Sequence, residues 1–210
     1  PILSANFPLA TYPLAALCLH TEFSPLPGLT FRESLYNGVA SDRINRQFRF
    51  CPHSDGMFNI GSLSYHIGEE DRHHGYYAVG YALGSSPSET SADKTFNYAL
   101  WTLIEQPLLH VGESHLGAMW QGGTSPASRS TCRHYWGAGL IWSNIPPRMT
   151  QVGLVVNRAL YADGRETDVE LTGSFPVCNH FTLQPAVHCI NTNGNYTAAA
   201  QLRAILEFGN

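Results

Sequence analysis

ETDVELTGSF (166–175), TLQPAVHC (182–189) and AAAQLRAILEF (198–208) are three stretches near the C-terminal end that share one pattern. In each stretch, apolar residues alternate with mostly polar ones, as Val169 and Leu171 alternate with Asp168 and Glu170. A period of two is typical of a β-strand with one apolar and one polar face. Turn-forming residues separate the stretches, so the pattern predicts three consecutive strands joined as hairpins.

The alternation fits two classes of β-protein. In a soluble sandwich the apolar face packs into a core, whereas in a transmembrane barrel it meets lipid and the polar face lines an aqueous lumen. Stretches of roughly 9–12 residues are long enough to cross a bilayer at a tilt, which favours the barrel. The last stretch also fits a helix because of its alanines, but six apolar positions from Ala198 to Phe208 keep the period of two, which favours a strand.

The composition limits the class of protein. Of the 210 residues, 43% are apolar and 13% are charged, and this charged share is about half that of an ordinary soluble domain. No apolar run approaches the roughly 18 residues of a transmembrane helix. The 10 Tyr, 10 Phe and 4 Trp residues match the aromatic girdles of a membrane barrel, or else an aromatic-rich secreted β-domain. A formal charge of −4 provides no basic patch, which argues against a nucleic-acid partner.

The cysteines and the N-terminus give little information about the class of protein. Five cysteines without a CxxC pair predict no zinc site and favour unpaired, small apolar residues. They are Cys18, Cys51, Cys132, Cys178 and Cys189. The chain opens at Pro1 without the pattern of a signal peptide, so we expect either a processed N-terminus or a fragment.

Similar alternation along the rest of the chain predicts an all-β protein of about eleven strands, with no helix, in one domain over residues 1–210. The other expected strands are 14–23, 29–37, 57–67, 75–83, 96–105, 111–121, 135–144 and 150–161. Polar stretches at 37–55 and 122–133 are expected to be long loops. Glu33 falls on the apolar side of its strand, which predicts a bulge or a strand end there.

Short motifs over most of the chain are shared with one known family. They are GYYAVGY (75–81), YALW (98–101), EQ (105–106), YWGAGL (135–140), QVGL (151–154) and LQP (183–185), with the closing residues 166–171 and 202–208. FPLA (7–10) and LYNG (35–38) also match. In these motifs the chain resembles the carbohydrate-selective outer-membrane porins of the OprB type.

The resemblance implies an antiparallel transmembrane β-barrel, of which this chain would supply the C-terminal half, about 10–11 of sixteen or so strands. It implies passive, sugar-selective diffusion of small carbohydrates through the bacterial outer membrane, with outer-membrane lipid around the barrel and with no catalysis or cofactor. A homo-oligomer and a partner chain that completes the barrel both stay open. Family members end on Phe, whereas Gly209 and Asn210 follow Phe208 here, a departure that bears on membrane assembly.

A pore selects a neutral sugar with side-chain donors and acceptors and with aromatic faces against the sugar ring. We expect the polar strand faces to supply these groups, with Trp101 as the stacking face. The candidate pore-lining residues are Arg32, Trp101, Glu105, Glu113, His115, Gln151, Glu170, Gln184 and Arg203. Each has an ordinary alternative as a solvated residue or a member of a local ion pair.

Two other classes stay open. His115 beside Ser114 and Glu113 suggests an outer-membrane barrel enzyme of the lipid-hydrolase type, although the spacing shows no converging triad. A secreted β-sandwich carbohydrate-binding module would show the same alternation and would purify without detergent. The run GEEDRHH (68–74) is interpreted as a charged turn rather than a metal site, because adjacent residues on a strand point to opposite faces.

Overall fold

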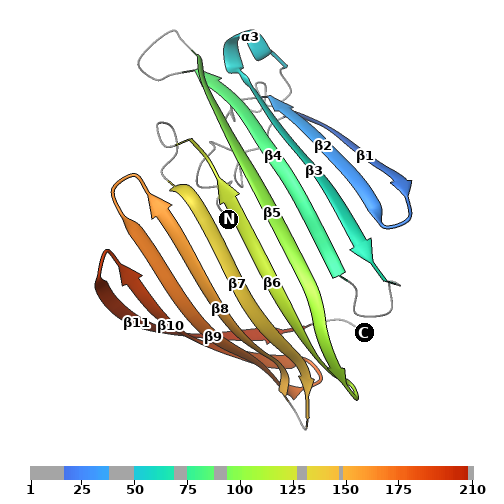
Figure 1. Cartoon of the computed structure of the whole chain (residues 1–210), viewed down its shortest axis with the longest axis vertical. Coiled ribbons are helices and arrows are strands. Elements are labelled where there is room, and N and C mark those ends of the chain that lie inside the picture. The colour runs from blue at the N-terminus through green and yellow to red at the C-terminus, as the bar shows by residue number, and fades with distance from the viewer. Residues whose placement is uncertain are drawn as a thin grey trace. The chain divides into compact units, whose positions relative to one another are not determined.

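Strands dominate the chain in a computed structural model that describes residues 17–37, 50–68, 75–87, 94–126, 132–146 and 149–207 (Figure 1). The strands are β1 (Cys18–Leu26), β2 (Leu29–Asn37), β3 (Met57–Ile67), β4 (Gly75–Pro87), β5 (Lys94–Val111), β6 (Ser114–Thr124), β7 (Cys132–Ile145), β8 (Met149–Tyr161), β9 (Arg165–Cys178), β10 (Phe181–Thr192) and β11 (Asn195–Leu206). The predicted all-β class is confirmed. Within the described residues, no helix combines the length and apolar character needed to span a bilayer.

The strands form one antiparallel meander, in which each strand is hydrogen-bonded to its neighbours in sequence from β1 to β11. The chain nevertheless divides into two compact units. Unit 1 consists of Pro1–Ile67, Tyr77–Thr102 and Gly123–His134. Unit 2 consists of Gly68–Tyr76, Leu103–Gly122 and Tyr135–Asn210.

The last segment of unit 2 is a strand, as its period of two predicts. β10 and β11 pair without interruption from Phe181↔Leu206 to Thr192↔Asn195. The connecting turn is Asn193-Gly194, and both residues have positive φ, at 54° and 97°. A two-residue turn with two positive φ angles twists in the same sense as the flanking strands and is favoured by Asn-Gly. This hairpin fixes the segment as a strand despite the helix propensity of its alanines.

The one helix among the described residues, α3 (Pro52–Asp55), lies in the stretch expected to be a loop, of which residues 38–49 fall outside the described part. It is a single turn, begun by a proline whose missing N–H group costs nothing at a helix start. Asn37 holds it to the end of β2, because its side-chain amide donates to Asp55 Oδ2 at 3.2 Å and its Oδ1 accepts from the Cys51 N–H at 3.4 Å. The turn therefore closes the end of the β2–β3 pair.

Glu33 corrects one prediction, because neither a bulge nor a strand end occurs at that position. Its pairing with Thr21 on β1 and Gly61 on β3 is in regular register, and the shift between β1 and β2 lies instead between Phe23 and Leu26. The Tyr81 hydroxyl donates to both Glu33 carboxylate oxygens, at 3.0 and 3.1 Å, and the Asn59 amide donates as well. Gly61 leaves the space that this carboxylate fills, since a Cβ there would overlap it.

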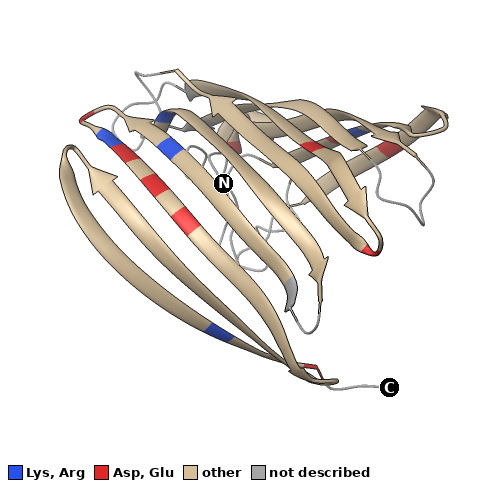
Figure 2. Cartoon of the chain, turned by 60° about the horizontal axis from the view of Figure 1, so that its bottom comes forward, with Lys and Arg blue, Asp and Glu red and all other residues tan. Residues whose placement is uncertain are grey.

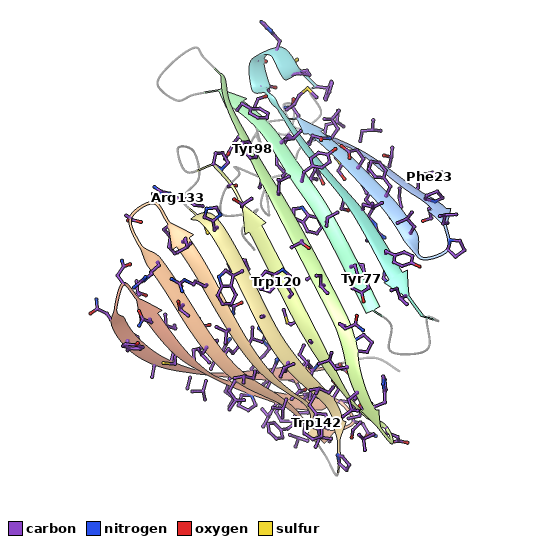
Figure 3. The ribbon with its side chains drawn as sticks, in the orientation of Figure 1. Phe23, Tyr77, Tyr98, Trp120, Arg133 and Trp142 are labelled. Carbon is purple, nitrogen blue, oxygen red and sulfur yellow. The ribbon has the colours of Figure 1, made fainter. Side chains whose placement is uncertain are left out.

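Many large apolar side chains are exposed in both units, among them Phe23 and Trp142, which are labelled in Figure 3. The buried cluster of unit 1 is small, with Phe58, Ala82 and Ala99 at its centre and Tyr36 and Ile60 packed against it. The exposed ones in unit 1 include Leu19, Phe23, Phe31, Leu63, Val79, Leu83, Phe96 and Leu100, and those in unit 2 include Leu140, Trp142, Leu154, Val169, Leu171, Val187, Leu202 and Leu206. Where two of these residues lie on one strand, they are two or four positions apart, so they share a face.

Two tryptophans stack across neighbouring strands of unit 2. The rings of Trp120 on β6 and Trp136 on β7 have centroids 6.0 Å apart and planes inclined by 9°. Trp136 is spaced by an even number of residues from the exposed Leu140 and Trp142 on β7, and Trp120 stacks on it, so both belong to the apolar face. Cross-strand aromatic pairs of this kind contribute about 0.2–1 kcal/mol to the pairing of two strands.

We predict that Gly80→Ala destabilises unit 1 by about 1–3 kcal/mol, as overpacking does elsewhere. A Cβ at Gly80 would collide with the indole ring of Trp101 and lie 2.6 Å from the carbonyl oxygen of Gly61. Thermal unfolding followed by circular dichroism measures the effect. Gly117→Ala is the matched control, because the nearest atom to a Cβ there is Gln106 O at 3.6 Å. Equal unfolding temperatures for the two variants would contradict the prediction.

Candidate functional site

Three neutral side chains form a hydrogen-bonded row across β6, β7 and β8 of unit 2. The Gln121 Nε2 donates to the Tyr135 hydroxyl at 2.7 Å, and this hydroxyl donates to Asn157 Oδ1 at 2.9 Å. Gly137 makes the row possible, because a Cβ there would overlap Asn157 Oδ1 and lie 3.1 Å from Gln121 Nε2. The three side chains therefore occupy the strand face opposite to Trp120 and Trp136.

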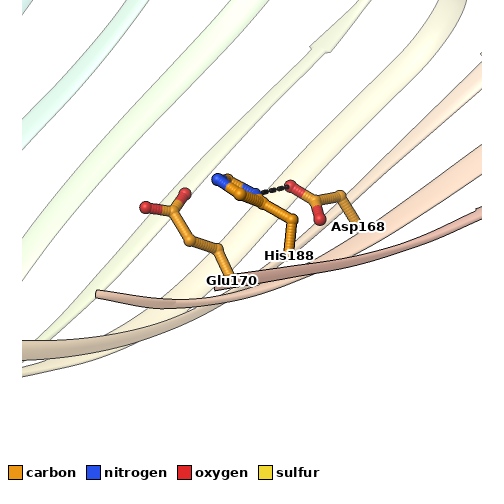
Figure 4. Close-up of side chains that lie close together, drawn as sticks. All are labelled: Asp168, Glu170 and His188. Carbon is orange, nitrogen blue, oxygen red and sulfur yellow. Dashed lines mark hydrogen bonds and ion pairs between the residues drawn. The ribbon is translucent and has the colours of Figure 1, made fainter. Parts of the chain in front are cut away.

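The polar face continues onto β9 and β10. Asp168 lies directly opposite Asn157 in the β8–β9 register, and Glu170 lies opposite His188 in the β9–β10 register. The His188 ring lies between the two carboxyl groups, with Nδ1 3.1 Å from Asp168 Oδ2 (Figure 4). The His188 and Asp168 side chains are 19% and 21% exposed, so the pair is largely shielded from water.

A register shift at the start of β10 creates this arrangement. Phe181 pairs with Cys178, but the next residue, Thr182, pairs with Pro176. Had the first register continued, His188 would face Leu171 and lie on the apolar face. Proline has no N–H to give to a strand ladder and is tolerated at such bulges. The one-residue shift therefore moves His188 to the side of Glu170.

Carboxylates are concentrated on this face of β9 (Figure 2). Glu166, Asp168 and Glu170 are spaced by two, and Glu166 accepts a hydrogen bond from Thr192 Oγ1 at 3.2 Å. Their register partners are Ala159, Asn157 and Val155 on β8, and Thr192, Ile190 and His188 on β10. His188 is the only one of these six partners that can carry positive charge.

Unit 1 has a polar face of its own on β1, β2 and β3. Arg32 Nε donates to Glu22 Oε2 at 2.8 Å, and Arg32 Nη1 donates to Ser64 Oγ at 3.3 Å. His20 Nδ1 and Ser34 Oγ are 2.7 Å apart and share a hydrogen bond. Each unit thus presents closely spaced donors and acceptors, the groups that recognise hydroxyl-rich or charged solutes.

The structure brings some of the predicted site residues into contact with others on the polar faces. Arg32 joins Glu22, Glu170 faces His188, and Gln184 lies opposite Arg203 in the β10–β11 register. Gln151 Nε2 donates to Ser143 Oγ at 3.4 Å. That these residues line a pore stays a prediction.

The remaining four candidates have other surroundings. Trp101 covers Gly80 in unit 1, and Glu105 is exposed on β5. His115 stacks on His110, with ring centroids 6.0 Å apart. Glu113 was expected within a strand, but it lies in the two-residue turn between β5 and β6, where Gly112 takes a φ of 63°.

Ser114, on which the hydrolase interpretation depends, is hydrogen-bonded to the end of β7. Ser114 Oγ donates to the backbone carbonyl of Asn144 at 2.7 Å, and the Asn144 side chain donates to the Glu113 carbonyl at 3.2 Å. These bonds fasten the β5–β6 turn to the end of β7, which is a structural use of the serine hydroxyl. Of the charged run 68–74, residues 69–74 lie outside the described residues.

Sequence reasoning did not select six residues that make contacts on the polar faces, namely Glu22, Gln121, Tyr135, Asn157, Asp168 and His188. The alternation along each strand already indicated the face on which each of these residues lies. It could not indicate which of them touch one another, because those contacts depend on the register between strands. Tyr135 carried the weakest signal, because an aromatic residue beside Trp136 fits either face.

Comparison with known proteins gives a likeness at the level of fold. No family model matches the chain, and no curated protein does. Among solved structures, the chain is similar to OprB of Pseudomonas putida in its high-pH structure, with a TM-score of 0.70 and 13% sequence identity. The match covers 92% of this chain and 58% of that chain, so this chain spans less than two thirds of its length. The fold implied by the resemblance is confirmed as porin-like.

Replacing Tyr135 with Phe is expected to destabilise unit 2 by about 1–3 kcal/mol, because Gln121 and Asn157 both lose a partner in a partly buried position. Denaturant unfolding measures the loss. Tyr196→Phe serves as the control: Tyr196 is 76% exposed on β11, and its change should stay within about 0.5 kcal/mol. A Tyr135→Phe protein as stable as the control would show that the row contributes nothing.

Proposed function

We propose that this chain forms part of the wall of a bacterial outer-membrane porin through which small carbohydrates diffuse passively. The observation that carries the proposal is the distribution of side chains within each unit. Large apolar residues are exposed on one strand face, and hydrogen-bonded polar residues occupy the other. Soluble proteins rarely expose apolar patches of this extent, whereas a membrane barrel turns such a face to lipid and its polar face to water.

Neutral sugars are the solutes that the polar faces suit best. The row of Gln121, Tyr135 and Asn157 carries no charge and combines amide and hydroxyl groups, which match the donors and acceptors of sugar hydroxyls. Arg32 and Glu22 neutralise each other at 2.8 Å, so they too offer polar groups with little net charge. Such contacts are weak enough individually to let a solute leave, as conduction requires.

A closed pore of this kind needs more strands than these eleven. β1 and β11 stand at the two ends of the strand order, and the porin to which the chain is similar is longer, with 58% of its length matched. Open strand edges cannot be left facing hydrocarbon, because their N–H and C=O groups would lose hydrogen bonds. We therefore include in the proposal that further strands, from the same protein or from a partner chain, close the barrel.

Planar-bilayer recording tests the porin function directly. The complete barrel, made of this chain and the strands or partner chain that close it, is refolded in detergent and inserted into the bilayer, and it is expected to give discrete current steps that small sugars reduce in a concentration-dependent way. Insertion is checked by heat-modifiable gel migration of the same sample. A folded, inserted complete barrel that gives no current steps would contradict the proposal that this chain forms part of a channel.

Trp101→Ala is expected to weaken the block by sugars roughly twofold to tenfold, because aromatic stacking contributes about 0.5–1.5 kcal/mol. The matched control is Trp142→Ala, since Trp142 is 51% exposed on the apolar face and is expected to meet lipid. The titration of current against sugar concentration gives both dissociation constants. An equal loss in the two variants would remove Trp101 from the sugar site.

A further inference from the structure

We propose that Asp168, Glu170 and His188 form a binding site for a divalent transition-metal ion, with Zn²⁺ as its natural probe. Each residue can offer one ligand atom, and these three atoms lie within 4.8 Å of one another (Figure 4). Carboxylate oxygens and an imidazole nitrogen are a ligand set that zinc accepts, commonly with water in the fourth position. The site adjoins the row of Gln121, Tyr135 and Asn157 that is proposed to meet sugars, because Asp168 lies opposite Asn157 in the β8–β9 register.

The backbone holds the three ligands on one face without strain. Asp168 and Glu170 are two residues apart on β9, so both point to the same side. His188 comes from β10 and lies directly opposite Glu170, because of the register shift at Phe181 and Thr182. Ligands from two rigid, hydrogen-bonded strands are positioned more closely than ligands on loops.

The spacing of the closest pair fits a shared ion. His188 Nδ1 and Asp168 Oδ2 are 3.1 Å apart. Two ligand atoms bound to a tetrahedral zinc ion at roughly 2.0–2.1 Å lie about 3.3 Å from each other. The ion would therefore take the place of the proton shared by these two atoms, and Glu170, whose ligand atom lies within 4.8 Å of both, would be the third ligand.

A second observation at Asp168 is independent of this spacing. Its other carboxylate oxygen, Oδ1, is buried and has no hydrogen-bond partner among the described residues. A carboxylate oxygen removed from water without a partner is unfavourable. A bound cation would relieve that deficit through the charge it brings to the carboxylate.

The charge around the cluster favours a cation as well. Glu166, Asp168 and Glu170 put three carboxylates on one face of β9, and their register partners on β8 and β10 contain no Lys or Arg. Like charges on one strand face repel one another, since neighbouring side chains there are separated by only about 7 Å. One divalent ion would cancel two of these charges and cross-link β9 to β10.

The test is Zn²⁺ binding by the folded chain in detergent, measured by competition with a chromophoric chelator. We expect one saturable site in the unaltered chain and at least tenfold weaker binding in His188→Ala and in Asp168→Asn. His134→Ala is the matched control and should bind as the unaltered chain does, because His134 is also a strand histidine but shares a hydrogen bond with Thr124. Circular dichroism confirms that each variant is folded.

Three results would overturn the site. They are no saturable binding by the folded, unaltered chain, equal affinity in all four proteins, or full competition by Ca²⁺ together with retained binding in His188→Ala. The last result would describe a loose acidic surface without an imidazole ligand. Because binding is measured in detergent, a failure of channel activity leaves this test unaffected.

Discussion

The hydrogen-bonded register between neighbouring strands is the constraint on which the other features of this chain depend. Side chains alternate between two faces, so a slip of one residue would exchange the polar and apolar sets of a whole strand. The pairing of β10 with β11 shows how the register is held, since Asn193-Gly194 closes the hairpin with two positive φ angles and every residue from Phe181 to Thr192 then has a partner. The two faces keep their distinct chemistry because such turns allow few other registers between the strands that they join.

Exceptions to the alternation are accommodated by neighbours on other strands. Glu33 stands on the apolar side of β2, yet the chain keeps its register because Tyr81 and Asn59 donate to the carboxylate and Gly61 leaves it room. His188 keeps the alternation of β10, and a shift in the β9–β10 register places it opposite Glu170. Glu33 is stabilised in the position that the regular register gives it, whereas the position of His188 beside β9 depends on an interruption of the register.

The strands were predictable because their signal is local. Residues 166–208 show their period of two without any knowledge of the partner strands, and the porin-like fold follows from many such segments joined by turns. The candidate site was predictable only as a list of residues on one face. The contact between Glu170 and His188 depends on a shift beside Pro176, and the satisfaction of Glu33 depends on β3 and β4. Glu113 was misplaced for a similar reason, because the length of β5 moves the turn to Gly112 and Glu113.

The stacked indoles of Trp120 and Trp136 have a consequence for spectroscopy. Two aromatic chromophores 6.0 Å apart interact through their transition dipoles, and a chiral arrangement of such a pair produces paired circular-dichroism bands of opposite sign. The pair spans β6 and β7, so this signal exists only while these two strands are in register. The chain therefore carries an intrinsic optical reporter of strand association, which distinguishes a correctly assembled hairpin from one that has β-structure but the wrong partners.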